Sequence, residues 1–194
     1  MVLDGYEDEP AAFGVPPYVG FHVRYVCGVM ESAGLNYEYM TVDRYRQALK
    51  TEPESIARRL NTCLGVVCIA GAVVPGKYLR GTPISLKETQ ALIRSLPQGT
   101  PALLGGWAIR GWKQQGWTPL RPNLFLALQD TDATLHHFLE RGEWKHQRRT
   151  PEQWTKWAQA GAASKAVTDH PDLGTEHRAG PVSYTHLTLP TMIR

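Results

Sequence analysis

Cysteine is scarce in this chain, and its three cysteines form no recognisable pattern. Cys27 falls in an amphipathic stretch, Cys68 falls in a continuous apolar stretch, and four residues separate Cys63 from Cys68. An odd and widely spaced set excludes a disulfide framework and lacks the spacing of a metal site. We therefore expect reduced thiols, with Cys27 and Cys68 in the core, and a cytoplasmic protein.

Long hydrophobic runs and a strong excess of one charge are also absent. No apolar run approaches the ~20 residues of a transmembrane helix, and the N-terminus does not resemble a signal peptide. The net charge of +3 is small, and the Lys and Arg residues are scattered except at residues 141–149, which we interpret as a solvated linker. We expect neither a membrane nor a nucleic acid as a partner.

Strand and helix patterns alternate along the chain. Its 194 residues, 42% of them hydrophobic, suffice for one core and an appendage. Residues 2–3, 37–42, 64–72, 102–106 and 124–128 have strand character, and helical patterns separate them. The stretch 64–72 is apolar almost throughout, which is typical of a parallel strand buried on both faces. The sequence predicts an α/β fold with a doubly wound, flavodoxin-like parallel sheet of about five strands in the order 2-1-3-4-5.

The pattern changes near residue 145. Thr150, Pro151 and Gln153 provide an N-cap, a proline at the first helical position and a capping-box glutamine, so a separate helix begins there. Trp154 and Trp157 share one face of this helix, which indicates docking on this domain or on one that follows. We expect an α/β domain over 1–145, a helix and linker over 146–181, and a non-native tail over 182–194. A native C-terminal strand is the alternative for the tail.

Candidate ligand-binding residues follow the first, third and fourth predicted strands. The carboxyl ends of parallel strands meet at one edge of a sheet, where glycine turns admit a ligand and helix N-terminal amides bind phosphate. Glycine also serves ordinary turns, so the three turns are evidence only when taken together. The long, acidic, proline-containing stretch 4–18 belongs to the same edge. The candidates are Asp4, Gly5, Tyr6, Gly71, Ala72, Val73, Gly105, Gly106 and Trp107.

No catalytic or metal-binding set can be assembled from the rest of the sequence. Glu7, Asp8 and Glu9 are consecutive and point in different directions, so we interpret them as solvated rather than as an acid–base pair or a metal site. His136 and His137 are expected on a helix surface, and His22 has no evident partner. The sequence favours a ligand-binding module over a complete enzyme.

Five short motifs carry a family resemblance: Asp4–Pro10, Phe13–Tyr18, Arg24-Tyr25, Ala72–Tyr78 and Arg149–Trp154. Together they resemble the N-terminal part of radical S-adenosylmethionine proteins with a cobalamin-binding-like domain, over about residues 1–180. In that family a catalytic domain follows, and its cysteine motif holds a [4Fe-4S] cluster that cleaves S-adenosylmethionine to a radical. This chain has no such motif. The resemblance implies that the cluster and S-adenosylmethionine belong to a missing C-terminal domain, the expected partner, and that this part alone is not catalytic.

The resemblance also bears on cobalamin. Cobalamin domains of the mutase and methionine synthase type carry Asp-x-His-x-x-Gly after the first strand, and the histidine is the lower cobalt ligand. Here Asp4 is retained, Tyr6 stands at the histidine position and Glu9 at the glycine position, whereas Gly105-Gly106 match a glycine pair near the cobalamin tail. A phenol does not supply the imidazole nitrogen that cobalt prefers.

The resemblance therefore implies cobalamin bound without a histidine ligand. Two alternatives stay open. One is a degenerate sheet domain that serves as an interaction platform, and the other is a stand-alone nucleotide- or flavin-binding protein.

Overall fold

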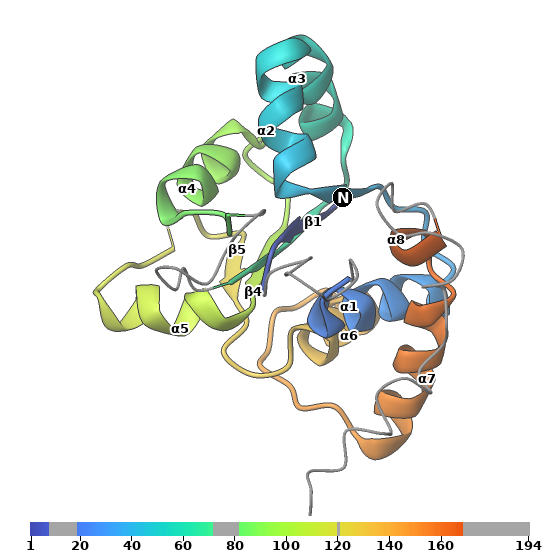
Figure 1. Ribbon diagram of the computed structural model, residues 1–194. Helices are drawn as coiled ribbons and strands as arrows, with labels where there is room; N and C mark the ends of the chain where they lie inside the picture. Colours follow the sequence, from blue (N-terminus) through green and yellow to red (C-terminus); the bar gives the residue numbers. More distant parts are fainter. Residues whose placement is uncertain (8–18, 72–81, 120, 169–194) are drawn as a thin grey trace, which may run out of the picture.

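A parallel sheet forms the centre of the molecule. The computed structural model describes residues 1–7, 19–71, 82–119 and 121–168 (Figure 1). Within these ranges the sheet has the order β2-β1-β3-β4-β5 and every pairing is parallel. The fold is thus α/β and flavodoxin-like, as predicted, with the apolar strand β3 at its centre. The strands are β1 (Val2–Gly5), β2 (Tyr39–Thr41), β3 (Val66–Ala70), β4 (Ala102–Gly105) and β5 (Leu124–Leu126).

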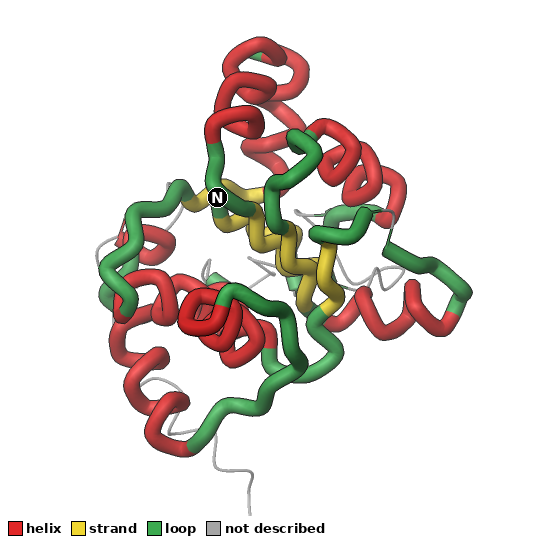
Figure 2. Tube along the Cα trace, turned by 180° about the vertical axis from the view of Figure 1, so that it is seen from behind, coloured by secondary structure: helices red, strands yellow, loops and turns green. Residues whose placement is uncertain are grey.

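Helices cover both faces of this sheet (Figures 1 and 2). The helices α1 (Phe21–Ser32) and α6 (Thr131–Arg141) pack on one face, and α2 (Val42–Thr51), α3 (Pro53–Thr62), α4 (Leu86–Ser95) and α5 (Trp107–Gln114) pack on the other. Neighbouring strand residues alternate between the faces: Cys68 joins the α2–α5 core, whereas Val67 and Ile69 join the α1–α6 core. Two apolar faces on each strand are what a doubly covered sheet requires.

The strand register aligns the predicted strand exits. Leu3 lies opposite Cys68, and Cys68 lies opposite Leu104. Because these strands are parallel, the segments that follow β1, β3 and β4 emerge at the same carboxyl edge. This confirms the predicted placement of the three exits.

A further layer lies outside α1. The helices α7 (Pro151–Ala162) and α8 (Lys165–Thr168) pack against α1, and Trp157 is buried there while Trp154 is exposed. An added Cβ at Gly28 would lie 2.1 Å from the Trp157 carbonyl oxygen, and one at Gly161 would lie 2.0 Å from that of Arg24. The two helices therefore approach at glycines. The sequence left open whether the helix at residue 150 docks on this domain or on a following one, and α7 packs on this domain.

Arg149 ties the segment before α7 to α6. Its Nη2 lies 3.3 Å from Asp130 Oδ1, its Nη1 lies 3.4 Å from Asp132 Oδ2, and its guanidinium lies 4.3 Å from the Tyr25 ring centroid. The prediction of a solvated linker was wrong at this residue, because the carboxylate of Asp132 is buried and a buried charge needs a partner.

The three cysteines are free, and Cys27 and Cys68 are buried as predicted. They belong to cores on opposite faces of the sheet, and burial raises the pKa of each thiol to about 12. In the parts of the chain that the structure describes, no helix is long and apolar enough to cross a membrane. The predicted tail at 182–194 lies outside the described residues.

Candidate functional site at the carboxyl edge of the sheet

Most of the predicted ligand residues lie at one edge. Asp4 and Gly5 end β1 and Tyr6 follows it, Gly71 follows β3, and residues 105–107 lead from β4 into α5. Ala72 and Val73 lie outside the described residues. The structure thus brings together the three turns that the sequence analysis combined, and the role of each residue follows from its contacts.

Asp4 makes hydrogen bonds within the protein. Its Oδ1 accepts a hydrogen bond from the Tyr6 backbone N–H at 3.0 Å, and its Oδ2 accepts one from the Tyr39 hydroxyl at 2.9 Å. Burial raises the pKa of Asp4 to about 6. Because both oxygens have protein partners, Asp4 holds the turn after β1 instead of facing a ligand.

Tyr6 is also a structural residue. Its backbone is left-handed, with φ of 58°, and its side chain is 7% exposed within the core on the α2–α5 side of the sheet. Burial raises the pKa of its phenol further above the ordinary value. The side chain at the position of the cobalamin-ligating histidine therefore points into the core.

At the glycines of this edge, other atoms of the protein fill the space that a side chain would take. An added Cβ would lie 2.1 Å from the Tyr6 carbonyl oxygen at Gly71, 2.0 Å from Thr131 Oγ1 at Gly105, and 2.3 Å from the Ala70 carbonyl oxygen at Gly106. These glycines let neighbouring segments pack closely. A cofactor tail could enter beside Gly105 only if Thr131 moved.

Glu7 and His22 form a buried pair at the same edge, which the sequence did not predict. Glu7 is 6% exposed, and its Oε1 contacts His22 Nδ1, which makes an ion pair when the imidazole is protonated. Its Oε2 accepts no hydrogen bond from the residues that the structure describes. The prediction that Glu7 is solvated and His22 unpartnered was wrong, because the turn after Tyr6 carries Glu7 to the start of α1. No local spacing could signal this contact, which joins the end of β1 to the next helix.

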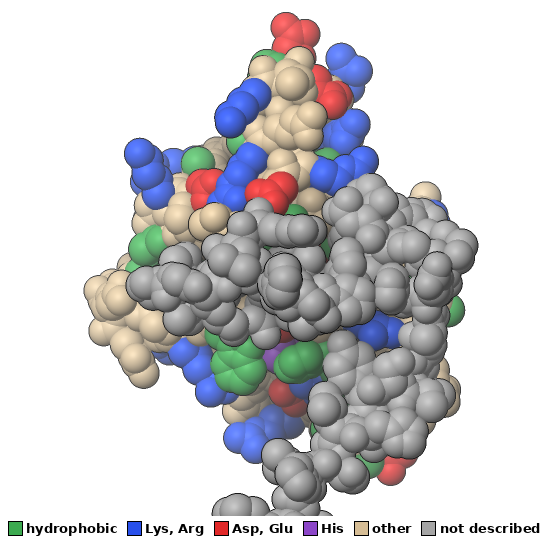
Figure 3. Space-filling model, viewed as in Figure 1, with side chains coloured by type: hydrophobic (Ala, Val, Ile, Leu, Met, Phe, Trp, Pro, Cys, Tyr) green, Lys and Arg blue, Asp and Glu red, His purple; other side chains and the backbone are tan. Residues whose placement is uncertain are grey.

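Aromatic side chains surround His22. Its ring lies edge-on to Trp107, with centroids 5.6 Å apart, and 4.4 Å from the Phe21 ring. Trp107 is 55% exposed and Phe21 is 44% exposed. On the face drawn in Figure 3, a histidine side chain lies between hydrophobic side chains. Since Nδ1 contacts Glu7, Nε2 is the ring nitrogen that can face a ligand.

Within the described parts of the chain, the two helices that begin beside this cluster have no side-chain cap. The N-cap residues of α1 and α5 are Gly20 and Gly106, whereas Thr41 and Ser85 cap α2 and α4 through their side chains. Uncapped helices keep free N–H groups in their first turn. The edge therefore combines exposed aromatic rings, an oriented imidazole and backbone donors, which together can stack on a flat group and hydrogen-bond to its acceptors.

The described residues hold no group of three or more His, Cys, Asp or Glu side chains that could bind a metal ion. The cysteines do not fit an iron–sulfur cluster either, because Cys27 and Cys68 are buried thiols on opposite faces of the sheet.

Comparisons with known proteins find relatives without a stated function. No family model matches the chain, and no solved structure matches it. An uncharacterized protein of Methanocaldococcus jannaschii is 30% identical over 182 residues, which are 89% of this chain and 32% of that protein. An uncharacterized protein of Archaeoglobus fulgidus is 45% identical over 87 residues, which are 45% of this chain and 16% of that protein. The chain thus spans about a third or less of the length of the relatives it matches.

Proposed function

We propose that this chain is the N-terminal cofactor-binding or regulatory domain of a longer radical S-adenosylmethionine enzyme, and that it is not catalytic by itself. Its cofactor lies over the carboxyl edge of the sheet, against Trp107, Phe21 and His22. The [4Fe-4S] cluster and S-adenosylmethionine belong to the C-terminal domain that completes the enzyme and is this domain's main partner. The proposal includes a cytoplasmic location, which the free buried thiols support.

The direction of the connections after β1 and β3 supports a ligand at this edge of the sheet. The helix that follows β1 packs on one face of the sheet, and the helix that follows β3 packs on the other. In open α/β sheets, ligands bind in the crevice where neighbouring connections diverge. The pair of Glu7 and His22 lies at this point.

Cobalamin is the first cofactor to test. Under this proposal a corrinoid would stack on the exposed aromatic rings, and Tyr6 would not contact its cobalt, because the Tyr6 side chain is in the core. The edge does not fit a corrinoid whose tail enters beside Gly105, because Thr131 fills that space. Substitution of Gly105 or Gly106 would disturb packing as well as binding, so a surface variant gives the cleaner test.

The experiment is titration of the whole chain with hydroxocobalamin, followed by absorbance and equilibrium dialysis. We expect Trp107→Ala to raise the dissociation constant about tenfold, a loss of ~1.4 kcal/mol that suits one aromatic contact. Trp154→Ala is the matched control, since Trp154 is 57% exposed on α7 and Trp107 is 55% exposed on α5. Equal effects of the two variants, or no cobalamin retained at high micromolar concentration, would contradict the proposal.

The second candidate is a sheet domain that serves as an interaction platform without cobalamin. The close contacts at Gly71, Gly105 and Gly106 favour it. Packing within the protein already explains why these positions are glycine, so a ligand is not needed to explain them. Under this alternative, Trp107 and Phe21 contact the rest of the longer protein. Loss of that contact in Trp107→Ala, with no binding of cobalamin or flavin to the chain, is the result that distinguishes it.

A further inference from the structure

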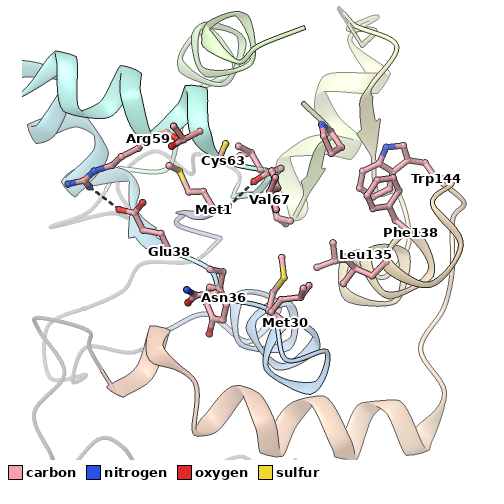
Figure 4. Close-up of a pocket in the computed structure, with 18 residues that line it drawn as sticks. Met1, Met30, Asn36, Glu38, Arg59, Cys63, Val67, Leu135, Phe138 and Trp144 are labelled. Atoms are coloured by element: carbon pink, nitrogen blue, oxygen red, sulfur yellow. Dashed lines mark hydrogen bonds and ion pairs between the residues drawn. The ribbon is translucent and has the colours of Figure 1, made fainter. Parts of the chain in front are cut away.

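A hollow lies at the opposite, amino edge of the sheet. It has a volume of about 530 Å³, and its walls come from the starts of β1 and β3, the ends of α1 and α3, and α6 (Figure 4). We propose that this cavity binds an amphipathic small molecule with a flat or branched apolar body and one hydrogen-bond-accepting head group, such as a carboxylate or carbonyl. This site is independent of the proposed function at the carboxyl edge.

One end of the cavity is apolar. Phe138 and Trp144 stack with ring centroids 3.7 Å apart and planes 11° apart, and Leu135 lies beside them in Figure 4. Met30 and Val67 line the hollow from α1 and β3, and both belong to the buried core. Aromatic and aliphatic walls of this kind, held by a packed core, are what small-molecule pockets use to bury an apolar ligand body.

The other end is polar. Arg59 Nη1 lies 2.9 Å from Glu38 Oε1, and both side chains are partly exposed, at 39% and 42%. Figure 4 shows this ion pair at the end away from Trp144, with Asn36 below it. Arg59 has five N–H donors, and its described hydrogen bond to Glu38 uses one of them. Because the pair is neutral overall, it suits one acceptor group and offers little to a polyphosphate.

Three exposed leucines form part of the rim of this hollow. Leu35 and Leu139 are each 39% exposed and Leu64 is 94% exposed, and all three line the cavity. The volume is within the range of about 300–1,000 Å³ that small-molecule sites occupy. An apolar ligand would remove the inner walls from water and leave its head at the ion pair.

Two fluorescent probes distinguish binding of the apolar body of the ligand from binding of its acceptor head group. N-phenyl-1-naphthylamine is neutral, and 8-anilinonaphthalene-1-sulfonate has a similar body with one anionic acceptor. With the whole chain, we expect Leu139→Arg to weaken binding of the neutral probe about tenfold, because it places a charge on the apolar rim. Leu49→Arg is the control, since Leu49 is 44% exposed on α2 and does not line the cavity. Arg59→Met should weaken only the anionic probe, by about tenfold, and change the neutral one by less than about twofold.

Methyl NMR spectra locate the bound probe. We expect the neutral probe to shift the methyl signals of Met30, Val67 and Leu135. Shifts confined to Val19, which precedes α1, and Val23, in its first turn, would place the probe at the carboxyl edge and overturn the proposal. Absence of binding, or equal effects of Leu139→Arg and Leu49→Arg, would also overturn it and would assign the exposed leucines to a contact with another protein surface.

Discussion

Asp4 is an acid that the fold keeps partly protonated near neutral pH. Its pKa is raised to about 6 from 3.8, chiefly by burial, and the nearby Glu7 carboxylate adds to the rise. Between these two values the folded protein holds a proton that the unfolded chain has released. This stabilising effect is therefore complete below about pH 4 and is lost as the pH rises through 6.

We predict that Asp4→Asn removes this pH dependence. The asparagine oxygen can still accept the hydrogen bond from the Tyr6 N–H. The free energy of unfolding of the variant, relative to that of the wild type, should rise by up to ~3 kcal/mol between pH 4 and pH 7. Urea unfolding of both proteins at the two pH values measures the difference. Glu88→Gln is a control of opposite sign, because the hydrogen bonds from Arg46 lower the pKa of Glu88 to about 2, so its stabilising effect is present near neutral pH and lost in acid. A constant difference between wild type and Asp4→Asn would contradict the prediction.

Single-residue roles could be predicted where the signal is local. Thr150 with Gln153 forms the predicted capping box, and Ser85 with Glu88 forms another, because a spacing of three residues decides such a contact. The contact between Glu7 and His22 had no such signal. It depends on the path of the chain between β1 and α1, which residue spacing does not determine.

The helices α1 and α7 depend on glycine where they cross. Gly161 faces the Arg24 backbone within α1, and Gly28 faces the Trp157 backbone within α7. A methyl group at either position would overlap a backbone atom, which cannot rotate away as a side chain can. The close approach of the helix axes thus requires these two residues.

We predict that Gly161→Ala destabilises the protein by about 1–3 kcal/mol through overpacking at this crossing. Gly111→Ala is the matched control, because Gly111 is also helical and nothing lies within 4 Å of an added Cβ. The control should gain up to about 1 kcal/mol from the higher helix propensity of alanine. Thermal or urea unfolding measures both effects, and a stabilising Gly161→Ala would mean that α7 does not pack on α1 as described.

At the scale of the molecule, the topology could be predicted and the outer layer could not. The alternation of strands and helices, with the apolar stretch at 64–72 in the centre, left few arrangements of a parallel sheet. The exposed Trp154 and buried Trp157 share a helix, and their sequence spacing did not reveal which surface receives α7. The cavity at the amino edge could not be predicted from the sequence either, because elements far apart in the sequence form its walls.

The last prediction concerns the extent of the folding unit. A chain that ends at residue 145 lacks Arg149 and α7, so the buried carboxylate of Asp132 loses its guanidinium and α1 loses the cover of Trp157. Removal of one partner from a buried ion pair alone costs about 3–5 kcal/mol, so this chain should unfold at much lower urea concentration or fail to fold. A chain that ends at residue 181 is the control and should stay within about 0.5 kcal/mol of the full chain. Arg149→Met in the full chain should fall between the two, because it removes the cation and keeps the helix. If the shortest chain unfolds at the urea concentration of the full one, the stable unit ends before α7, and the packing of α7 on α1 contributes nothing to it.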